Sequence, residues 1–197
     1  MPAGYFIYNA LIINEDRQYK GNILVQGEQI AWIGQGEPPE EFSMHGIERI
    51  DAEGMWLIPG AIDDQVHFRE PGLTHKGDIY TESKAAVAGG ITSFMEMPNT
   101  RPAATTHSLL EEKYQAAAER SWANYSFYLG ASNSNLEEVL KTDPEKVCGI
   151  KVFMGSSTGN LLLDDRAALK ELFRQCKMLI ALHCENDTRI AENAQRF

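Results

Sequence analysis

From residue 57 onwards, short apolar runs alternate with segments that carry helix signals, and this alternation limits the possible folds more than any other feature of the chain. Such alternation is typical of an α/β protein in which helices join parallel strands. The expected strands cover residues 57–62, 91–97, 125–129, 149–153 and 178–182. The expected helices cover residues 78–88, 109–121, 135–140 and 164–176, and a further helix begins at Asn186. Ser108 and Glu111 have the spacing of a capping box for the second of these helices.

Two architectures fit about five βα units of this kind: an open doubly wound sheet and a TIM-type (β/α)8 barrel. Polar residues recur at the carboxyl ends of the expected strands, namely His67, Asn99, Lys151 and His183. A barrel places its active site at that end, although open sheets also bind ligands there. We favour the barrel. Eight units need roughly 250 residues, and only about 140 follow Leu57, so we expect the chain to be the front part of a longer enzyme.

The region before residue 57 is rich in strand signals instead. Strands are expected at residues 5–13 and 47–51, and residues 21–25 and 29–34 are expected to form a hairpin around a Gly-Glu turn. The sequence therefore predicts two domains. Residues 1–56 form a small β domain, and residues 57–197 form the first part of the α/β barrel.

The composition narrows the classes of partner. Lys and Arg total 18 against 28 Asp and Glu, and the resulting formal net charge of −10 argues against nucleic acid or an anionic membrane as partner. No apolar stretch approaches the roughly 20 residues that span a bilayer, and the N-terminus lacks the regions of a signal peptide. Cys148, Cys176 and Cys184 have no Cys-x-x-Cys spacing, which predicts reduced thiols in a cytoplasmic protein.

The strongest chemical signal is the pair His67 and Arg69, which lie two residues apart after the apolar run at residues 57–63. We expect this run to be a buried strand. A histidine imidazole can bind a metal ion, and the planar fork of an arginine fits a carboxylate. The pair predicts a metal-assisted reaction on a small anionic substrate. The alternative is a histidine that makes ordinary hydrogen bonds.

Lys151 is a second signal, because a lysine in the middle of a strand that is buried on both faces is costly unless it is paired or modified. It could reach a carboxylate, react with carbon dioxide to give a carbamate that bridges two metal ions, or extend to the surface. His183 could be a metal ligand or a strand-end histidine. Asn99 could bind the same anion as Arg69 or simply form a turn. The glycine-rich segment 154–160 is a weak phosphate-loop match, and a loop above a site is the better interpretation.

Together these segments resemble the dihydroorotases and their cyclic-amidohydrolase relatives, the hydantoinases and allantoinases. The segments 67–72 and 97–100, His-Phe-Arg-Glu-Pro-Gly and Met-Pro-Asn-Thr, look like dihydroorotase motifs in particular. The segment 150–154 is similar to the family strand that carries a carbamylated lysine, and the segment 182–186 is similar to the next metal-histidine segment. The region before residue 57 looks like the N-terminal half of the β-sandwich that flanks these barrels.

The resemblance implies the roles of the site residues. His67 and Lys151 would ligate zinc, Lys151 as a carbamate, and His183 would ligate a second or shared ion, so the cofactor would be one or two zinc ions. Arg69 and Asn99 would hold the substrate carboxylate. The catalytic aspartate of the family is expected beyond Phe197. The implied partners are dihydroorotate or N-carbamoyl-aspartate and a second copy in a homodimer.

One position departs from the family pattern, which usually has histidine, any residue, histidine at the end of the first barrel strand. Gln65 occupies the first of these positions, and an amide oxygen is a poorer zinc ligand than an imidazole. Three outcomes follow: a single-zinc enzyme, a binuclear enzyme with substitute ligation by Asp63, Asp64 or water, or a protein that has lost the reaction.

The leading hypothesis is therefore the reversible hydrolysis of dihydroorotate to N-carbamoyl-aspartate. The alternatives are a hydantoinase or allantoinase, which acts on rings that do not need Arg69, and a non-catalytic scaffold, which Gln65 favours. A barrel enzyme of unrelated chemistry is a third alternative, because the fold alone does not fix the reaction.

Overall fold

A computed structural model describes residues 2–155 and 161–196 of the chain. The chain divides into two compact units, Met1–Pro59 and Gly60–Phe197. The sequence placed the boundary after residue 56, and the assignment of the two units to a sandwich domain and a barrel domain stays a prediction. Most of the segment 154–160, for which the sequence predicts a loop above the site, lies outside the described residues.

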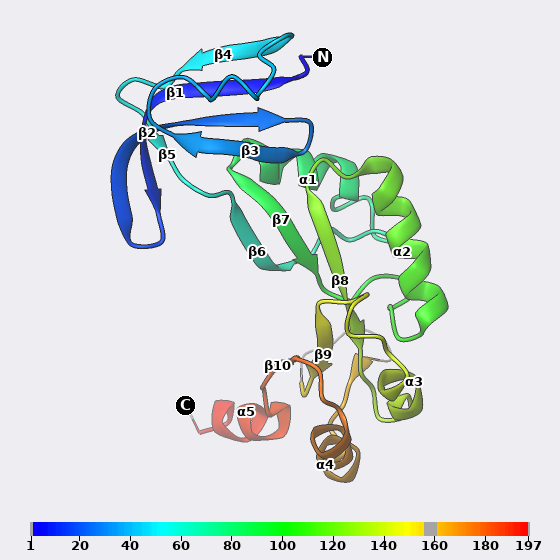
Figure 1. The fold of residues 1–197 in the computed structure, drawn as a ribbon. Helices are drawn as coiled ribbons and strands as arrows, with labels where there is room; N and C mark the ends of the chain where they lie inside the picture. The colour runs from blue at the N-terminus through cyan, green and yellow to red at the C-terminus, as the bar shows by residue number, and fades with distance from the viewer. Residues whose placement is uncertain (1, 156–160, 197) are drawn as a thin grey trace. The chain divides into compact units, whose positions relative to one another are not determined.

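The first unit is a five-stranded sheet with the order β3-β2-β1-β4, in which β5 pairs with β1 (Figure 1). Its strands are β1 (Gly4–Asn14), β2 (Arg17–Gln26), β3 (Gln29–Gly34), β4 (Ile47–Asp51) and β5 (Trp56–Leu57). β1, β2 and β3 pair antiparallel, whereas β4 and β5 run parallel to β1. The expected hairpin and strands are confirmed. The described residues form one sheet, so the predicted β-sandwich is not confirmed.

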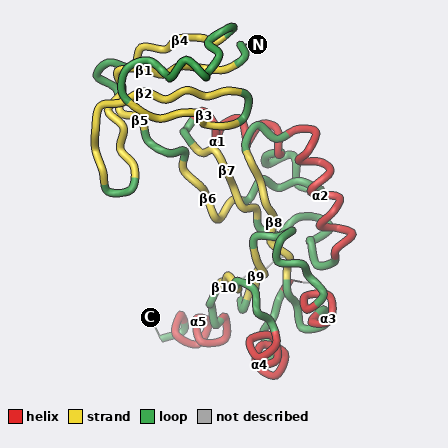
Figure 2. The backbone as a smooth tube through the Cα atoms, viewed as in Figure 1, coloured by secondary structure: helices red, strands yellow, loops and turns green. Residues whose placement is uncertain are grey.

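The second unit is built on a parallel five-stranded sheet with the order β10-β9-β8-β7-β6. Its strands are β6 (Ala61–Val66), β7 (Ile91–Glu96), β8 (Asn124–Gly130), β9 (Gly149–Phe153) and β10 (Ile180–His183). Its helices are α1 (Ile79–Ala88), α2 (His107–Arg120), α3 (Leu136–Leu140), α4 (Arg166–Gln175) and α5 (Asp187–Ala194). The sheet curls (Figure 1), and α2 runs beside β8 (Figure 2). The α/β prediction is confirmed, and the curled sheet fits part of a barrel.

The core of this unit lies between the sheet and its helices. Phe127, Leu129, Ile150 and Val152 of the central strands are fully buried and pack with Leu172 of α4. Every residue of β9 is buried, which is expected for an inner strand of a parallel sheet. Lys151, one of the predicted site residues, lies in this buried strand.

The expected strand at residues 57–62 is wrong. Its first residue belongs to β5 in the first unit, and its last two belong to β6 in the second. Pro59 and Gly60 separate the two strands, because proline cannot donate to a ladder and glycine weakens a strand. β6 is also not a buried strand, since Ile62 is 63% exposed. β6 is an edge strand of the sheet that the described residues of this unit form.

The predicted capping box is also wrong by two residues. Thr106, not Ser108, is the N-cap of α2, and its hydroxyl accepts a hydrogen bond from the backbone N–H of Leu109 at 3.3 Å. Thr106 has the extended backbone of a cap residue, with φ −132° and ψ 158°, whereas Ser108 already lies in the first turn. The range of the helix itself was predicted within two residues at its start.

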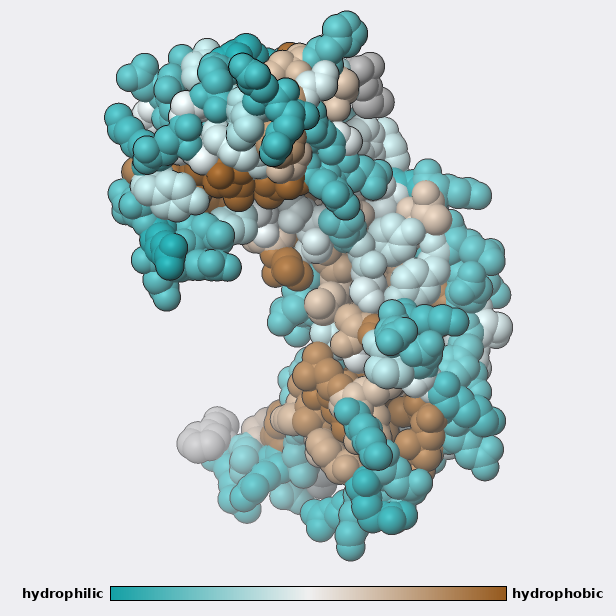
Figure 3. All heavy atoms as spheres, in the orientation of Figure 1, coloured by the Kyte–Doolittle hydropathy of each residue, from teal (hydrophilic) through white to brown (hydrophobic). Residues whose placement is uncertain are grey.

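The second unit leaves several apolar side chains exposed near its last strand. Phe173 is 51% exposed, Leu179 62% and Leu182 37%. Figure 3 shows apolar surface gathered over the region of β9 and β10. Within residues 2–155 and 161–196, no helix has both the length and the apolar character that crossing a lipid bilayer requires.

Candidate active site

His67 follows β6 directly and makes the central contact of the site. Its Nδ1 atom lies 2.8 Å from Oδ1 of Asn99, which follows β7. An amide oxygen only accepts hydrogen bonds, so this contact places a proton on Nδ1 and leaves Nε2 available as a ligand atom. The neighbouring parallel strands β6 and β7 thus bring together two of the predicted site residues.

The charge state of His67 also suits a ligand. Burial lowers the pKa of His67, the hydrogen bond that His67 donates to Asn99 opposes this, and the positive charges of Arg69 and Lys151 lower the pKa further. The neutral imidazole, which is the form that binds a metal ion, is therefore favoured at neutral pH.

Two loops carry these residues, the His67 loop (residues 67–73) and the Asn99 loop (residues 97–102). Arg69 has a left-handed backbone with φ 70°, and its carbonyl accepts a hydrogen bond from Leu73 N at 3.0 Å. The two loops meet where Arg101 N donates to Pro71 O at 3.1 Å. Gly72 lies at the same contact with φ 81°, and a Cβ there would lie 2.0 Å from the carbonyl oxygen of Arg101. Only glycine fits this approach.

Glu70 anchors the other side of the His67 loop. Its Oε2 accepts a hydrogen bond from Ile79 N at 2.9 Å, and its Oε1 forms an ion pair with Arg120. The first turn of α1 and the last turn of α2 are thus both connected to this loop. These contacts of Glu70 fix the backbone next to Arg69.

Lys151 lies in the middle of β9 and is only 3% exposed. Its ammonium lies 5.0 Å from the ring centroid of Phe153, and no carboxylate of the described residues lies within ion-pair distance. Burial lowers the pKa of Lys151, and the neighbouring Cys184 thiol opposes this shift. The neutral amine, which is the form that reacts with carbon dioxide, is therefore more populated than in an exposed lysine.

His183 is the last residue of β10 and pairs in register with Phe153 of β9. Side chains alternate along a strand, so Lys151, Phe153 and His183 share one face of the sheet. The His183 Nε2 atom lies 3.1 Å from Oε1 of Glu185, and the ring centroids of His183 and Phe153 are 5.8 Å apart. The strand register therefore places two of the three predicted ligands beside one another.

The fit to a metal ion is partial. Gln65 N donates to Asp63 Oδ1 at 3.0 Å, which occupies one oxygen of that carboxylate. In the part of the chain that the structure describes, no group of three or more His, Cys, Asp and Glu residues is placed to hold a metal ion. The donors that fit are the free Nε2 of His67 and the unpaired amine of Lys151. The metal-ligand set, including the doubtful Gln65 and Asp63, stays a prediction.

Two residues beneath the site were not predicted from the sequence, Glu96 at the end of β7 and Lys113 in α2. Both side chains are fully buried, and they form an ion pair with 2.9 Å between Nζ and Oε2. A glutamate inside the expected strand 91–97 was an available signal, because a buried carboxylate needs a partner. Nothing in the spacing of α2 distinguished Lys113 from an exposed helical lysine.

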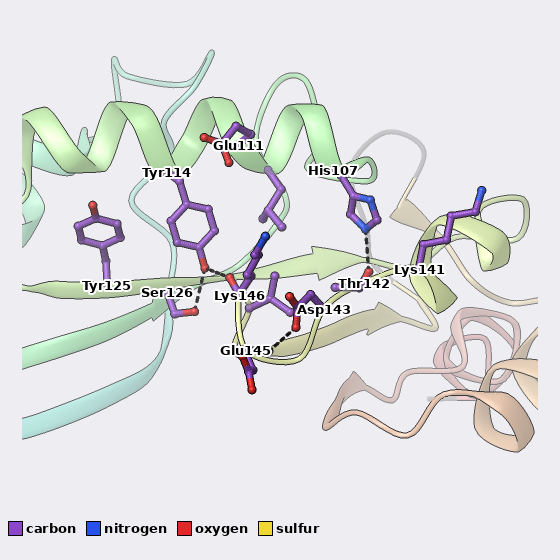
Figure 4. Close-up of a pocket in the computed structure, with 12 residues that line it drawn as sticks. His107, Glu111, Tyr114, Tyr125, Ser126, Lys141, Thr142, Asp143, Glu145 and Lys146 are labelled. Carbon is purple, nitrogen blue, oxygen red and sulfur yellow. Dashed lines mark hydrogen bonds between the residues drawn. The ribbon is translucent and has the colours of Figure 1, made fainter.

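A cavity of about 700 Å³ lies elsewhere in the same unit, between α2, the first residues of β8 and the segment 141–147 (Figure 4). None of the predicted site residues lines it. Its polar walls bond to one another: Tyr114 Oη donates to Lys146 O at 2.5 Å, and His107 Nε2 lies 3.0 Å from Thr142 Oγ1. The loops after β6 and β7 are therefore the stronger candidate site.

Comparison with known proteins points to one family. The family model described as dihydro-orotase-like matches residues 54–195. A dihydroorotase of Wolbachia sp. subsp. Drosophila simulans is 43% identical over 135 residues, which cover 67% of this chain and 29% of that protein. An allantoinase of Deinococcus radiodurans is 29% identical over 203 residues, covering 99% of this chain and 44% of that protein.

The fold is similar to those of solved hydantoinase and dihydropyrimidinase structures. The structure of an L-hydantoinase (dihydropyrimidinase) from Arthrobacter aurescens superimposes with a TM-score of 0.87 at 28% identity, covering 100% of this chain and 44% of that chain. A dihydropyrimidinase from Brevibacillus agri gives a TM-score of 0.76 at 29% identity, covering 93% of this chain and 40% of that chain. The chain thus spans less than half the length of these relatives.

Proposed function

This chain belongs to the dihydro-orotase-like family, and on that basis we propose that it contributes to a zinc-dependent cyclic amide hydrolase that interconverts dihydroorotate and N-carbamoyl-L-aspartate. The observation that carries the proposal is the contact between His67 and Asn99, because Arg69 follows His67 by two residues in the same loop. It joins a ligand-competent imidazole to two groups that can bind an anion. A complete (β/α)8 barrel, flanked by a β-sandwich that includes the first unit, belongs to the same proposal.

Each residue has a defined task in this proposal. Arg69 binds the carboxylate of the substrate through two parallel hydrogen bonds, and the amide NH₂ of Asn99 donates to the same group. The amide oxygen of Asn99 meanwhile holds His67 in one tautomer. Fixing the carboxylate at one side of the site orients the ring carbonyl, which is the positioning contribution to the rate.

The zinc ion would be held by His67, Lys151 and His183, with Lys151 as a carbamate. A zinc ion lowers the pKa of a bound water toward ~7 and so supplies a nucleophile at neutral pH. The proton transfer to the leaving nitrogen requires a carboxylate, which we expect from the catalytic aspartate that the family carries on a later strand.

Substrate comparison tests the proposal. We expect the protein, supplied with zinc, to turn over or bind dihydroorotate and to discriminate against hydantoin and allantoin, which lack the ring carboxylate. Preference for the neutral rings would contradict the dihydroorotase assignment and favour a hydantoinase or allantoinase. Failure to retain zinc on dialysis, together with no binding of any ring, would favour a non-catalytic protein.

A further inference from the structure

The buried ion pair between Glu96 and Lys113 lies beneath the site, and the proposed chemistry does not use it. Glu96 is 0% exposed and Lys113 is 1% exposed. Replacing a buried ion pair by apolar residues of similar volume is often neutral or stabilising, because removing two charges from water is costly. Stability alone is therefore a weak explanation for this pair, and its other contacts suggest what it does.

Glu96 holds the His67 loop. Its Oε1 accepts a hydrogen bond at 3.1 Å from the backbone N–H of Phe68, the residue between His67 and Arg69. Arg69 has φ 70°, a conformation that is unfavourable for residues other than glycine. The carboxylate therefore stabilises the turn that sets the directions of the His67 and Arg69 side chains.

Lys113 holds the Asn99 loop. Its Nζ donates to Met97 O at 3.1 Å, two residues before Asn99. The Lys113 ammonium also lies 4.9 Å from the ring centroid of Phe127 in β8, and this contact helps to hold the ammonium in the core. Met97 N in turn donates to Val66 O at 3.0 Å, next to His67. Glu96 thus binds the His67 loop, and Lys113 binds the Asn99 loop.

We propose that the Glu96–Lys113 ion pair is a positioning element that sets the His67 and Arg69 side chains against Asn99. The carboxylate fixes the first loop, the ammonium fixes the second, and their mutual attraction fixes the separation of the two. The part of this inference that concerns ligand affinity rests on the proposed function. The part that concerns the His67–Asn99 contact does not.

The test replaces the pair by apolar residues in the double variant E96L/K113M. Single variants would leave one buried charge without a partner and could unfold the chain. A second variant, E96Q/K113M, keeps an oxygen that can accept from the Phe68 N–H. The control is L110A, which opens a cavity in the same helix, at a side chain that is 5% exposed and packs in the main core.

Two measurements are made on the whole chain. Nitrogen-15 NMR of the imidazoles reports the tautomer of His67 without any ligand or metal, and calorimetric titration with dihydroorotate reports affinity. We expect E96L/K113M to keep the native fold but to lose the single Nδ1–H tautomer and to bind dihydroorotate about tenfold or more weakly. We expect E96Q/K113M to lie between it and the wild type. L110A should keep the tautomer and the affinity despite a lower melting temperature.

The proposal is overturned if E96L/K113M retains the single tautomer and wild-type affinity, since the pair would then be a dispensable part of the core. Equal losses in L110A would also overturn it, because the effect would be general destabilisation. If E96L/K113M does not fold, E96Q/K113M makes the same comparison. If the wild-type chain binds no dihydroorotate, the proposed function fails, whereas the tautomer measurement still decides the positioning role.

Discussion

Asn99 combines one observed contact with one proposed role, and its sequence context suggested them only in part. The sequence offered an anion ligand or a turn residue, and the structure adds a hydrogen bond that its Oδ1 accepts from His67 Nδ1. These roles are compatible because a side-chain amide has an acceptor oxygen and a separate NH₂ donor. At the scale of single residues, Asn99 can therefore hold His67 and still donate to a bound anion.

Arg69 is the residue that we expect to distinguish carboxylated from neutral ligands. Hydrogen bonds to charged groups contribute about 1.5–3 kcal/mol, so Arg69→Ala should weaken dihydroorotate binding by roughly tenfold to a hundredfold. Zinc content, measured by atomic absorption, should stay near that of the wild type. Arg166→Ala removes an exposed arginine at the start of α4 and serves as the control. Equal affinities of the Arg69 variant and the wild type would refute the assignment.

The thiol of Cys148 gives a pH-dependent prediction. Burial raises the pKa of Cys148 from 9.0 to about 11, so its thiolate population near pH 8 falls about a hundredfold. We expect iodoacetamide to label the exposed Cys184 well before Cys148 in the native chain. The raised pKa also means that this thiol stabilises the fold fully below pH 9 and that the contribution is lost as the pH rises through 11. Labelling of Cys148 as fast as Cys184 at pH 8 would contradict the prediction.

At the scale of elements, the site depends on two loops that are bound to each other as well as to the strands before them. The strand pairing Val66↔Glu96 aligns the last residues of β6 and β7, so the His67 loop and the Asn99 loop begin side by side at the same edge of the sheet. The backbone bond between Arg101 and Pro71 then closes the gap between them. The close approach at Gly72 makes this contact sensitive to a single methyl group.

Gly72→Ala should therefore destabilise the fold more than a glycine substitution that only changes backbone conformation. A Cβ at Gly72 would meet backbone atoms of Arg101 at 2.0 Å, whereas a Cβ at Gly90 would meet nothing within 4 Å, and both glycines have positive φ. We expect Gly90→Ala to cost about 1–2 kcal/mol from the left-handed backbone alone and Gly72→Ala to cost clearly more. Urea unfolding of the two variants measures the difference. Similar costs would show that the loops separate without penalty.

At the scale of the whole molecule, charge limits the partners. A net charge of −10 opposes binding to the phosphate backbone of nucleic acids. We expect no binding of duplex DNA by fluorescence anisotropy at low salt, where such binding is strongest. The basic groups would act locally instead, on one small anion at Arg69. Salt-sensitive DNA binding would show a basic surface that the net charge conceals.

The order of the elements was predictable because it depends on local patterns. Apolar runs, helix caps and Gly-Gly signals are read over a few residues, so β9 and β4 were predicted to the residue and α1 within one residue. The local patterns failed at residues 57–62, where one apolar run serves two sheets. They also failed at Thr106, because either hydroxyl could cap the helix and packing selected between them.

The residue types of the site were evident from the sequence alone, since a histidine, an arginine and an asparagine after successive strands carry chemistry wherever they fold. Their mutual arrangement was decided only by the tertiary structure. The bond between His67 and Asn99 spans 32 residues, and the ion pair of Glu96 and Lys113 joins a strand to a helix. Contacts of this kind depend on strand register and on which helical face is buried, and no local signal specifies either for a buried charge.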